Sequence, residues 1–357
     1  GLSYITKLGG KFAILTATLP QIIIDLMQRE KLEFKEPVTF TNNLIRHSVK
    51  VIDKLIDDKG SIDYIIASFK RNKILVICNT VRNAKKVYQL IKDALSIEDK
   101  SSIHLLHSGI IRKDRRKKED SIMNLGSRVN SDYGIWVTTQ IVEASLDIDF
   151  DYLFTELSDL SGLFQRMGRC YRNRSIDLEY NCYVFTGGDK KCSGVGPIID
   201  EEIFHLSKET INKIDGIINE TTKVKLISSV YTTENLKHSK YYKKIVATID
   251  YVKSISSYEL DRKDVIKLFR DINQVAVIPS CVFERYQNNI SEWKEVLNKK
   301  TGSLEERIKA KEFISDLMVP IPRNLLDNII LQKDKINDYE ELIIVDAQYD
   351  NEYGIDL

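Results

Sequence analysis

Three polar residues in the middle of the chain have the types and spacing that phosphate binding requires. Gln165, Arg169 and Arg172 follow one another at steps of four and three residues, so a helix would place all three on one face. Guanidinium groups fork onto phosphate oxygens and stay charged as negative charge develops there. We therefore predict that these residues sense a nucleotide's phosphate chain, with the two arginines as arginine fingers. A basic surface helix with ordinary salt bridges is the alternative.

The residues around this motif predict the elements that position it. Short apolar runs at 135–137 and 152–154 are typical of strands buried on both faces. The second run leads into the predicted arginine helix, where Gly168 permits a close approach of the backbone. The motif is thus expected where a strand passes into a helix.

The same alternation of apolar runs and helical stretches extends over much of the chain. Further strands are predicted at 74–77, 103–106 and 183–185. Strands that alternate with helices indicate an α/β fold with a doubly wound parallel sheet, whose ligands bind at the carboxyl ends of the strands. Those ends carry Thr80, His107, Ser108, Thr138, Thr139, Gln140 and Glu156.

Outside these strands the sequence predicts further helices, and after Pro197 the regular alternation of strands and helices ends. A helix is expected at 21–29, a linker at 31–45, a helix at 52–70 that is interrupted at Lys59 and Gly60, and another helix at 84–95. Beyond Pro197 the predicted elements are helices at 200–215 and 258–272, a charged helical region at 290–314, and short apolar runs at 275–278 and 317–322. This last part is expected to be of α+β character.

The composition is that of a soluble globular protein with two or three structural units. Its 357 residues are too many for one ordinary core. Because 53 basic residues nearly balance 52 acidic ones, any contact with nucleic acid must use local patches. The sequence shows neither a signal-peptide pattern nor an apolar run near 18 residues, so we expect neither export nor a membrane span.

The cysteines and histidines do not suggest a metal centre. Five cysteines, at positions 78, 170, 182, 192 and 281, form no C-x-x-C pair. Their odd number is typical of reduced thiols in a cytoplasmic protein, and argues against a disulfide framework or a zinc site.

The first residues of the sequence look like the interior of a domain, so we expect the chain to be a fragment.

Several motifs together resemble a known family. TATLP (16–20) and ILVICNT (74–80) resemble motifs of superfamily-2 helicases. TQIVEASLDIDFDYLFTEL (139–157), followed by LFQRMGRCYR (163–172), is most similar to the CRISPR-associated helicase–nuclease of type I interference systems. Shorter matches are the His107-Ser108 step with the basic residues after it, VAVIP (275–279) and YDNEYGIDL (349–357). The resemblance covers most of residues 11–190 and, more loosely, the rest.

For the nucleotide, the resemblance implies a site that this chain completes from one side. Arg169 and Arg172 would reach the γ-phosphate of ATP, and Gln165 would contact it or orient the attacking water. Asp147 would touch the ribose or the arginines, unless it is a structural loop residue. Arg166, together with Gly168, would complete the cofactor-binding set and brace the interface between two lobes.

For nucleic acid, the resemblance implies a groove that follows a single DNA strand. Thr139 and Gln140 would bind phosphates at a strand end, although a capping role for the hydroxyl is the alternative. The other candidates are Thr80, Arg82, His107 and Arg112. His107 could equally be a satisfied polar residue at a strand end, and the basic run 112–118 could equally be a solvated helix face. Thr16 and Thr18 would couple hydrolysis to strand movement.

The resemblance also implies an architecture and partners. Residues 1–35 would end a first RecA-like lobe, 36–199 would form the second RecA-like lobe, and 200–357 would form a smaller accessory domain. No G-x-x-x-x-G-K-[ST] loop, D-E-x-H motif or His-Asp nuclease signature occurs in the sequence. ATP and Mg2+ would therefore be held mainly by a first lobe upstream, with a nuclease domain beyond it. A CRISPR surveillance complex and single-stranded DNA are the implied partners.

The implied function is an ATP-driven, 3′-to-5′ single-strand DNA translocase that helps to degrade foreign DNA in antiviral defence. The fragment alone would be inactive. A DEAH-type RNA helicase or a restriction-motor lobe is the alternative within the enzymes, and a module that only binds nucleic acid or a partner is the alternative outside them.

Overall fold

The computed structural model describes residues 1–143, 146–254, 274–298, 303–326, 328–336 and 340–357. Contacts within the chain group its residues into two compact units. The first unit comprises Gly1–Asn79 and Ile148–Glu259, and the second comprises Thr80–Asp147 and Leu260–Leu357.

The strands of the parallel sheet divide between the two units: β2-β5-β6-β1-β7 are neighbours in that order in the first unit, and β3-β4 are neighbours in the second. The strands are β1 (His47–Ile52), β2 (Lys73–Ile77), β3 (Ile103–Leu106), β4 (Gly134–Thr138), β5 (Tyr152–Glu156), β6 (Cys182–Phe185) and β7 (Gly216–Ile218). In the first unit β2, β5, β6 and β1 pair in parallel and β7 closes the edge antiparallel, and in the second unit β3 pairs in parallel with β4. The predicted α/β fold with a mostly parallel sheet is confirmed.

Uninterrupted apolar strands are the reason that the sheet could be predicted. Ile74, Leu75, Val76 and Ile77 of β2 are all fully buried, as expected for a strand covered on both faces. β1 escaped prediction because His47, Ser48 and Lys50 break its apolar pattern, and only its pairing with β6 and β7 makes it a strand.

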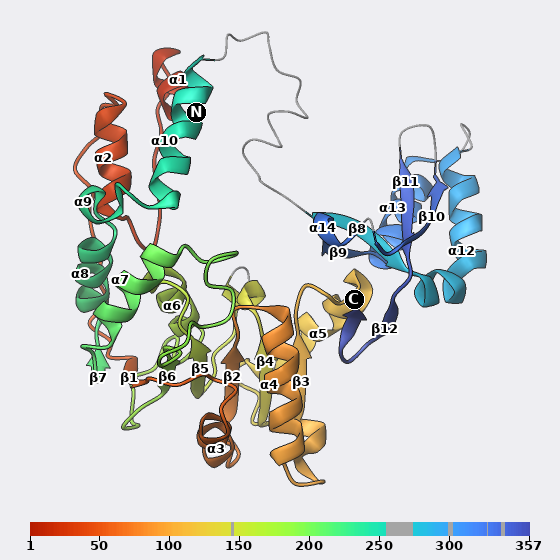
Figure 1. The fold of residues 1–357 in the computed structure, drawn as a ribbon, viewed down its shortest axis with the longest axis horizontal. Helices are drawn as coiled ribbons and strands as arrows, with labels where there is room; N and C mark the ends of the chain where they lie inside the picture. Colours follow the sequence, from red (N-terminus) through yellow and green to blue (C-terminus); the bar gives the residue numbers. More distant parts are fainter. Residues whose placement is uncertain (144–145, 255–273, 299–302, 327, 337–339) are drawn as a thin grey trace. The chain divides into compact units, whose positions relative to one another are not determined.

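One helix of the first unit begins and ends at the residues that the sequence predicted. This is α2 (Gln21–Arg29), which follows Pro20. The others are α1 (Leu2–Lys7), α3 (Lys59–Ser68), α6 (Leu160–Met167), α7 (Glu201–Ile211), α8 (Glu220–Val230), α9 (Thr233–Leu236) and α10 (Lys240–Ser254). α6 packs beside β5, and α8 packs against both α6 and α7 (Figure 1).

The predicted arginine helix is shorter than expected, and this corrects the prediction. α6 ends at Met167 with Gly168 as its C-cap, and Tyr171 has a left-handed φ of 48°, which no helix continues through. Gln165 lies on α6, whereas Arg169 and Arg172 lie in the turn after it. The three side chains therefore do not share a helix face.

The second unit contains the other helices and two smaller sheets. Its helical segments are α4 (Val81–Ala94), η1 (Asp99–Ser102), α5 (Arg112–Leu125), η2 (Gln140–Glu143), α12 (Ser280–Asn298), α13 (Leu304–Asp316) and α14 (Arg323–Leu326). A four-stranded sheet has the order β10-β11-β8-β9, and β12 pairs with β13. These strands are β8 (Gln274–Pro279), β9 (Val319–Pro322), β10 (Ile330–Lys335), β11 (Glu341–Val345), β12 (Gln348–Asp350) and β13 (Gly354–Asp356).

The part after Pro197 has the mixed character that was predicted. Helix α12 packs against β8 and β11 of the four-stranded sheet and against α13 (Figure 1). The helix predicted at 258–272 lies outside the described residues. Because α7–α10 belong to the first unit and β8–β13 to the second, the units do not follow the predicted domain boundaries, which stay a prediction. None of the described helices combines the length and apolar character needed to cross a lipid bilayer.

Candidate nucleotide site and nucleic-acid residues

The turn that carries the two arginines is fixed through its backbone. We name Gly168–Arg172 the arginine turn. The carbonyl of Arg169 accepts a hydrogen bond from the N–H of Phe150 at 3.0 Å, and the N–H of Tyr171 donates to the carbonyl of Phe150 at 3.2 Å. Phe150 and Cys170 form an isolated parallel bridge. The turn is thus hydrogen-bonded to the segment that precedes β5.

A buried carboxylate holds the end of this turn. The N–H of Arg172 donates to Oδ1 of Asp149 at 3.0 Å, and Asp149 is only 7% exposed. Nε of Arg174 lies 3.5 Å from Oδ2 of the same carboxylate. Asp149 therefore fixes where the backbone of Arg172 stands.

Arg174 completes the fixation from outside the predicted motif. Its Nη2 donates to Oδ1 of Asp151 at 2.7 Å and to the carbonyl of Phe150 at 3.0 Å. Its guanidinium lies 3.9 Å from the centre of the Tyr171 ring, close enough for a cation–π contact. The Tyr171 hydroxyl donates to Asp177, and burial, followed by that carboxylate, raises the pKa of Tyr171.

Arg166 differs from the other arginines of the motif because it is fully buried. Its Nη1 donates to Oγ1 of Thr155 at 2.9 Å and to the carbonyl of Glu156 at 2.8 Å. The side chain thus ties α6 to the carboxyl end of β5. These contacts lie inside one unit, and the predicted role at an interface between two lobes stays a prediction.

The other nucleotide residues differ in their access to solvent. Gln165 and Asp147 are exposed, while Arg169 and Arg172 are half-buried. Gly168 supplies the C-cap of α6. Their assignment to ATP stays a prediction.

Beneath the arginine turn lies a buried histidine. Nε2 of His47 is 2.7 Å from the carbonyl oxygen of Met167 and 2.9 Å from that of Cys170, and its Nδ1 is 2.8 Å from Nζ of Lys223. Carbonyls only accept and an ammonium only donates, so Nε2 carries the hydrogen and the ring is neutral. Burial, helped by the charges of Lys223 and Arg46, lowers the pKa of His47 to about 3.

Lys223 is itself held by a carboxylate. Its Nζ lies 2.8 Å from Oε1 of Glu220, which is 2.5 Å from Nη2 of Arg46. Burial lowers the pKa of Lys223. Burial also raises the pKa of Glu220, but hydrogen bonds and charge from Lys223 and Arg46 outweigh it and lower this pKa to about 2.

The predicted nucleic-acid residues of the second unit do not all offer a surface. Thr80 is the N-cap of α4, its hydroxyl accepting from the N–H of Asn83, and Arg82, two residues further on, is exposed. Thr139 is only 5% exposed, and Gln140 begins η2 and is half-buried. Arg82 has the most open position of this set.

His107 is a buried, hydrogen-bonded residue at a strand end, as the alternative to DNA contact requires. It is fully buried, its Nε2 lies 3.1 Å from the carbonyl oxygen of Tyr353, and its Nδ1 accepts from the N–H of Gly109 at 3.0 Å. Burial, with the charge of Lys85, lowers its pKa to about 3. A side chain with no exposed surface cannot contact a DNA strand as it stands, which argues against the predicted contact.

Much of the basic run 112–118 is engaged within the second unit. Arg112 donates to Oγ of Ser315 at 3.0 Å, and Arg116 forms an ion pair with Asp316. Nζ of Lys118 donates to the carbonyls of Leu105 and Glu352. The run therefore ties α5 to the end of α13 and to the β12–β13 hairpin. Arg112 keeps a half-exposed side chain.

The predicted coupling residues lie near the start of the first unit. Thr16 is exposed, and its hydroxyl donates to the carbonyl of Thr18 at 2.8 Å. Thr18 is half-buried. The two threonines thus form a local turn, and their coupling role stays a prediction.

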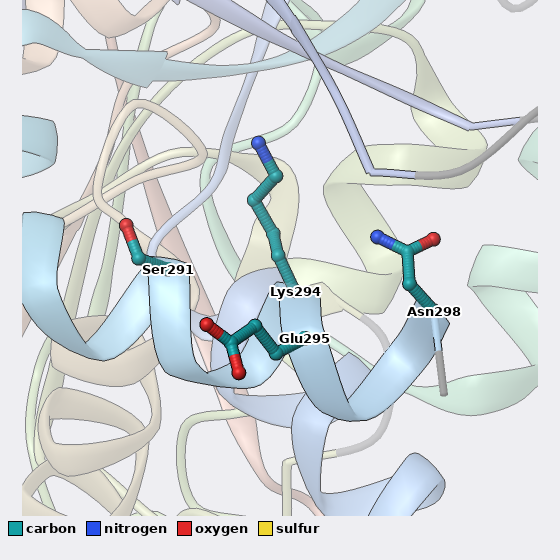
Figure 2. Close-up of a pocket in the computed structure, with 4 residues that line it drawn as sticks. All are labelled: Ser291, Lys294, Glu295 and Asn298. Carbon is teal, nitrogen blue, oxygen red and sulfur yellow. The ribbon is translucent and has the colours of Figure 1, made fainter.

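A hollow on the second unit is lined by none of these residues. Ser291, Lys294, Glu295 and Asn298 line it from successive turns of one helix face, as Figure 2 shows. Lys294 is paired with Asp334 at 2.5 Å. In the part of the chain that the structure describes, no group of three or more His, Cys, Asp and Glu is placed to hold a metal ion.

Sequence reasoning missed the residues that fix the arginine turn. Asp149 could have been found, since acids alternate through Asp147, Asp149 and Asp151. The other supporting residues gave no such signal, because Arg46 and His47 lie more than 100 residues from the motif that they contact. Glu220 and Lys223 meet His47 and Arg46 only in the folded chain.

The comparisons with known proteins agree with the resemblance. The family described as "CRISPR-associated nuclease/helicase Cas3, C-terminal" matches residues 70–175. The CRISPR-associated nuclease/helicase Cas3 of Methanothermobacter thermautotrophicus is 25% identical over 352 residues, which covers 88% of this chain and 40% of the relative.

Solved structures share the fold. The structure of T. fusca Cas3-AMPPNP is 14% identical with a TM-score of 0.62, covering 90% of this chain and 43% of that one. A chain of a structure described as "CRISPR RNA-guided surveillance complex, pre-nicking" is 17% identical with a TM-score of 0.57, covering 90% and 43%. The chain spans less than half the length of these proteins. Together the comparisons support the predicted identification as a C-terminal helicase part of the Cas3 type.

Proposed function

We propose, on the premise of this similarity to the C-terminal helicase part of Cas3, that the chain serves in an ATP-dependent single-strand DNA translocase. The whole protein would move 3′ to 5′ along the strand and, with an upstream nuclease domain, degrade foreign DNA in CRISPR antiviral defence. A CRISPR surveillance complex would deliver that strand, a proposal supported by the similar chain in such a complex.

One observation supports this proposal most: the backbone of the arginine turn is fixed from two sides. Phe150 and Asp149 hold Arg169 and Arg172 through the main-chain atoms of the two arginines, so a fixed turn sets the position from which each side chain extends. Preorganised charge of this kind stabilises a phosphoryl-transfer transition state.

The residues present fit one side of a bound nucleotide. Guanidiniums suit the phosphate chain of ATP, while Mg2+ requires oxygen ligands that the described residues do not gather in one group. We propose that a first lobe upstream holds Mg2+ and most of ATP. ATP supplies the phosphoryl group, and this chain's Arg169 and Arg172 stabilise the charge that develops on it.

The experiment is ATP hydrolysis by the complete protein with single-stranded DNA, RNA or duplex DNA added. Single-stranded DNA is expected to stimulate hydrolysis most, and chain 1–357 alone is expected to hydrolyse none. Stronger stimulation by RNA would favour the RNA-helicase alternative, and hydrolysis by 1–357 alone would show that the chain is a complete motor.

A further inference from the structure

The carbonyls of the arginine turn are held by side chains that the proposed reaction does not itself use. At a helix end the last carbonyls lack partners within the helix. One imidazole N–H of His47 serves the carbonyl of Met167, the last residue of α6, and the carbonyl of Cys170 in the arginine turn. Nη1 of Arg46 donates to the carbonyl of Arg172 at 2.9 Å. His47, the first residue of β1, and Arg46, just before it, thus bind the turn in addition to Phe150 and Asp149.

A second layer fixes the orientation of that imidazole. Nζ of Lys223, on α8, faces Nδ1 of His47, so the ring can present its N–H only to the carbonyls. Glu220 then bridges Lys223 back to Arg46. His47 is fully buried and the side chain of Lys223 is only 6% exposed. Burying an ammonium group costs free energy unless the group is paired. Lys223 is paired with both His47 and Glu220, so the buried contacts favour one orientation of the imidazole.

We propose that His47, oriented by Lys223, is a positioning residue for ATP hydrolysis that sets the backbone of the arginine turn. This inference rests on the proposed function. His47 acts through the carbonyls of Met167 and Cys170 rather than through an arginine side chain. A shift of the turn by about 1 Å would move both guanidiniums, and displacements of that size can cost roughly a hundredfold in rate.

The test compares His47 variants of the complete protein. His47→Leu removes both the donor and the acceptor, while His47→Gln keeps one of each. With saturating single-stranded DNA, we expect His47→Leu to lower kcat for ATP hydrolysis roughly ten- to a hundredfold with little change in the Kd for ATP. His47→Gln is expected to recover most of that loss.

Val49→Ala is the matched control, because Val49 is fully buried on the same strand and its side chain offers no hydrogen bond to the turn. Variants are compared at temperatures equally far below their melting points. Should His47→Leu not fold, Lys223→Met gives a second reading: it keeps the imidazole but removes the group that orients it, and a smaller loss of kcat is expected.

The outcomes separate this inference from the proposed function. If Arg169→Ala and Arg172→Ala abolish hydrolysis but the His47 and Lys223 variants behave as Val49→Ala does, the positioning role is wrong and the proposed function stands. The positioning role is also wrong if His47→Gln loses as much kcat as His47→Leu. If the arginine variants keep full kcat, both proposals are overturned.

Discussion

The backbone N–H of Arg172 donates to the buried carboxylate of Asp149 at 3.0 Å. This bond joins a residue of the QRMGRCYR stretch (165–172) to one that lies 23 positions earlier in the chain. The arginine turn is thus held at its backbone, and a shift of that backbone would shift the side chain of Arg172 with it.

Removing this carboxylate should destabilise the chain. Asp149→Ala leaves the Arg172 N–H without its acceptor, and an unsatisfied buried donor costs about 1–3 kcal/mol. Urea unfolding measures the loss. Asp189→Ala, which removes an exposed carboxylate, is the control and should be nearly neutral; equal effects of the two changes would contradict the structural role of Asp149.

Acid should weaken the fold through two buried histidines. The pKa values of His47 and His107 are lowered from 6.5 to about 3, so below pH 6.5 the unfolded chain binds protons that the folded chain does not. The contribution of the two neutral histidines to the free energy of unfolding is therefore fully present above pH 6.5. It falls as the pH drops towards 3, by up to about 1.4 kcal/mol per pH unit for each histidine.

The free energy of unfolding at pH 7 and at pH 5 measures this effect. The interval avoids Glu220, whose lowered pKa removes stability only below its ordinary value of 4.5. His107→Gln should reduce the slope between the two pH values by the share that His107 contributes, while the share of His47 remains. An unchanged slope would show that His107 is protonated in the folded chain.

A glycine in the last hairpin should resist substitution. Gly354 has a φ of +76°, and a Cβ there would lie 2.4 Å from the carbonyl oxygen of Gly109. Gly216 has a φ of +86° but nothing within 4 Å of such a Cβ. Gly354→Ala should thus cost clearly more than the roughly 1–3 kcal/mol of backbone strain that Gly216→Ala carries alone. Thermal unfolding of both variants decides, and equal costs would contradict the close approach.

Two basic residues of the second unit should behave differently towards DNA. Arg82 is exposed at the start of α4, whereas Lys118 is committed to two carbonyls. Arg82→Ala should weaken single-stranded DNA binding and reduce its salt dependence by about 0.7 in slope. Lys118→Met should leave both unchanged while lowering stability. The salt dependence of DNA affinity checks this. If Lys118→Met weakens binding and Arg82→Ala does not, the basic run 112–118 binds DNA and this prediction is wrong.

Elements and contacts could be predicted from the sequence where the signal lay in a short stretch of neighbouring residues. Ile74–Ile77 predicted β2 because an apolar run needs no partner to be recognised, and Pro20 marked the start of α2. The arginine spacing suggested a helix, but Gly168 and the left-handed Tyr171 end it. The support from His47 and Lys223 could not be predicted, since those residues meet only after β1 and α8 have packed.

The most direct test of the nucleotide assignment is hydrolysis by Arg169→Ala and Arg172→Ala in the complete protein, measured beside the Kd for ATP. Arg307→Ala, an exposed arginine on α13, is the control. We expect each turn variant to lose roughly 10³-fold or more in kcat while ATP binding stays within a few-fold and the control is unchanged. Full hydrolysis by the turn variants, or loss of their fold, would contradict the assignment.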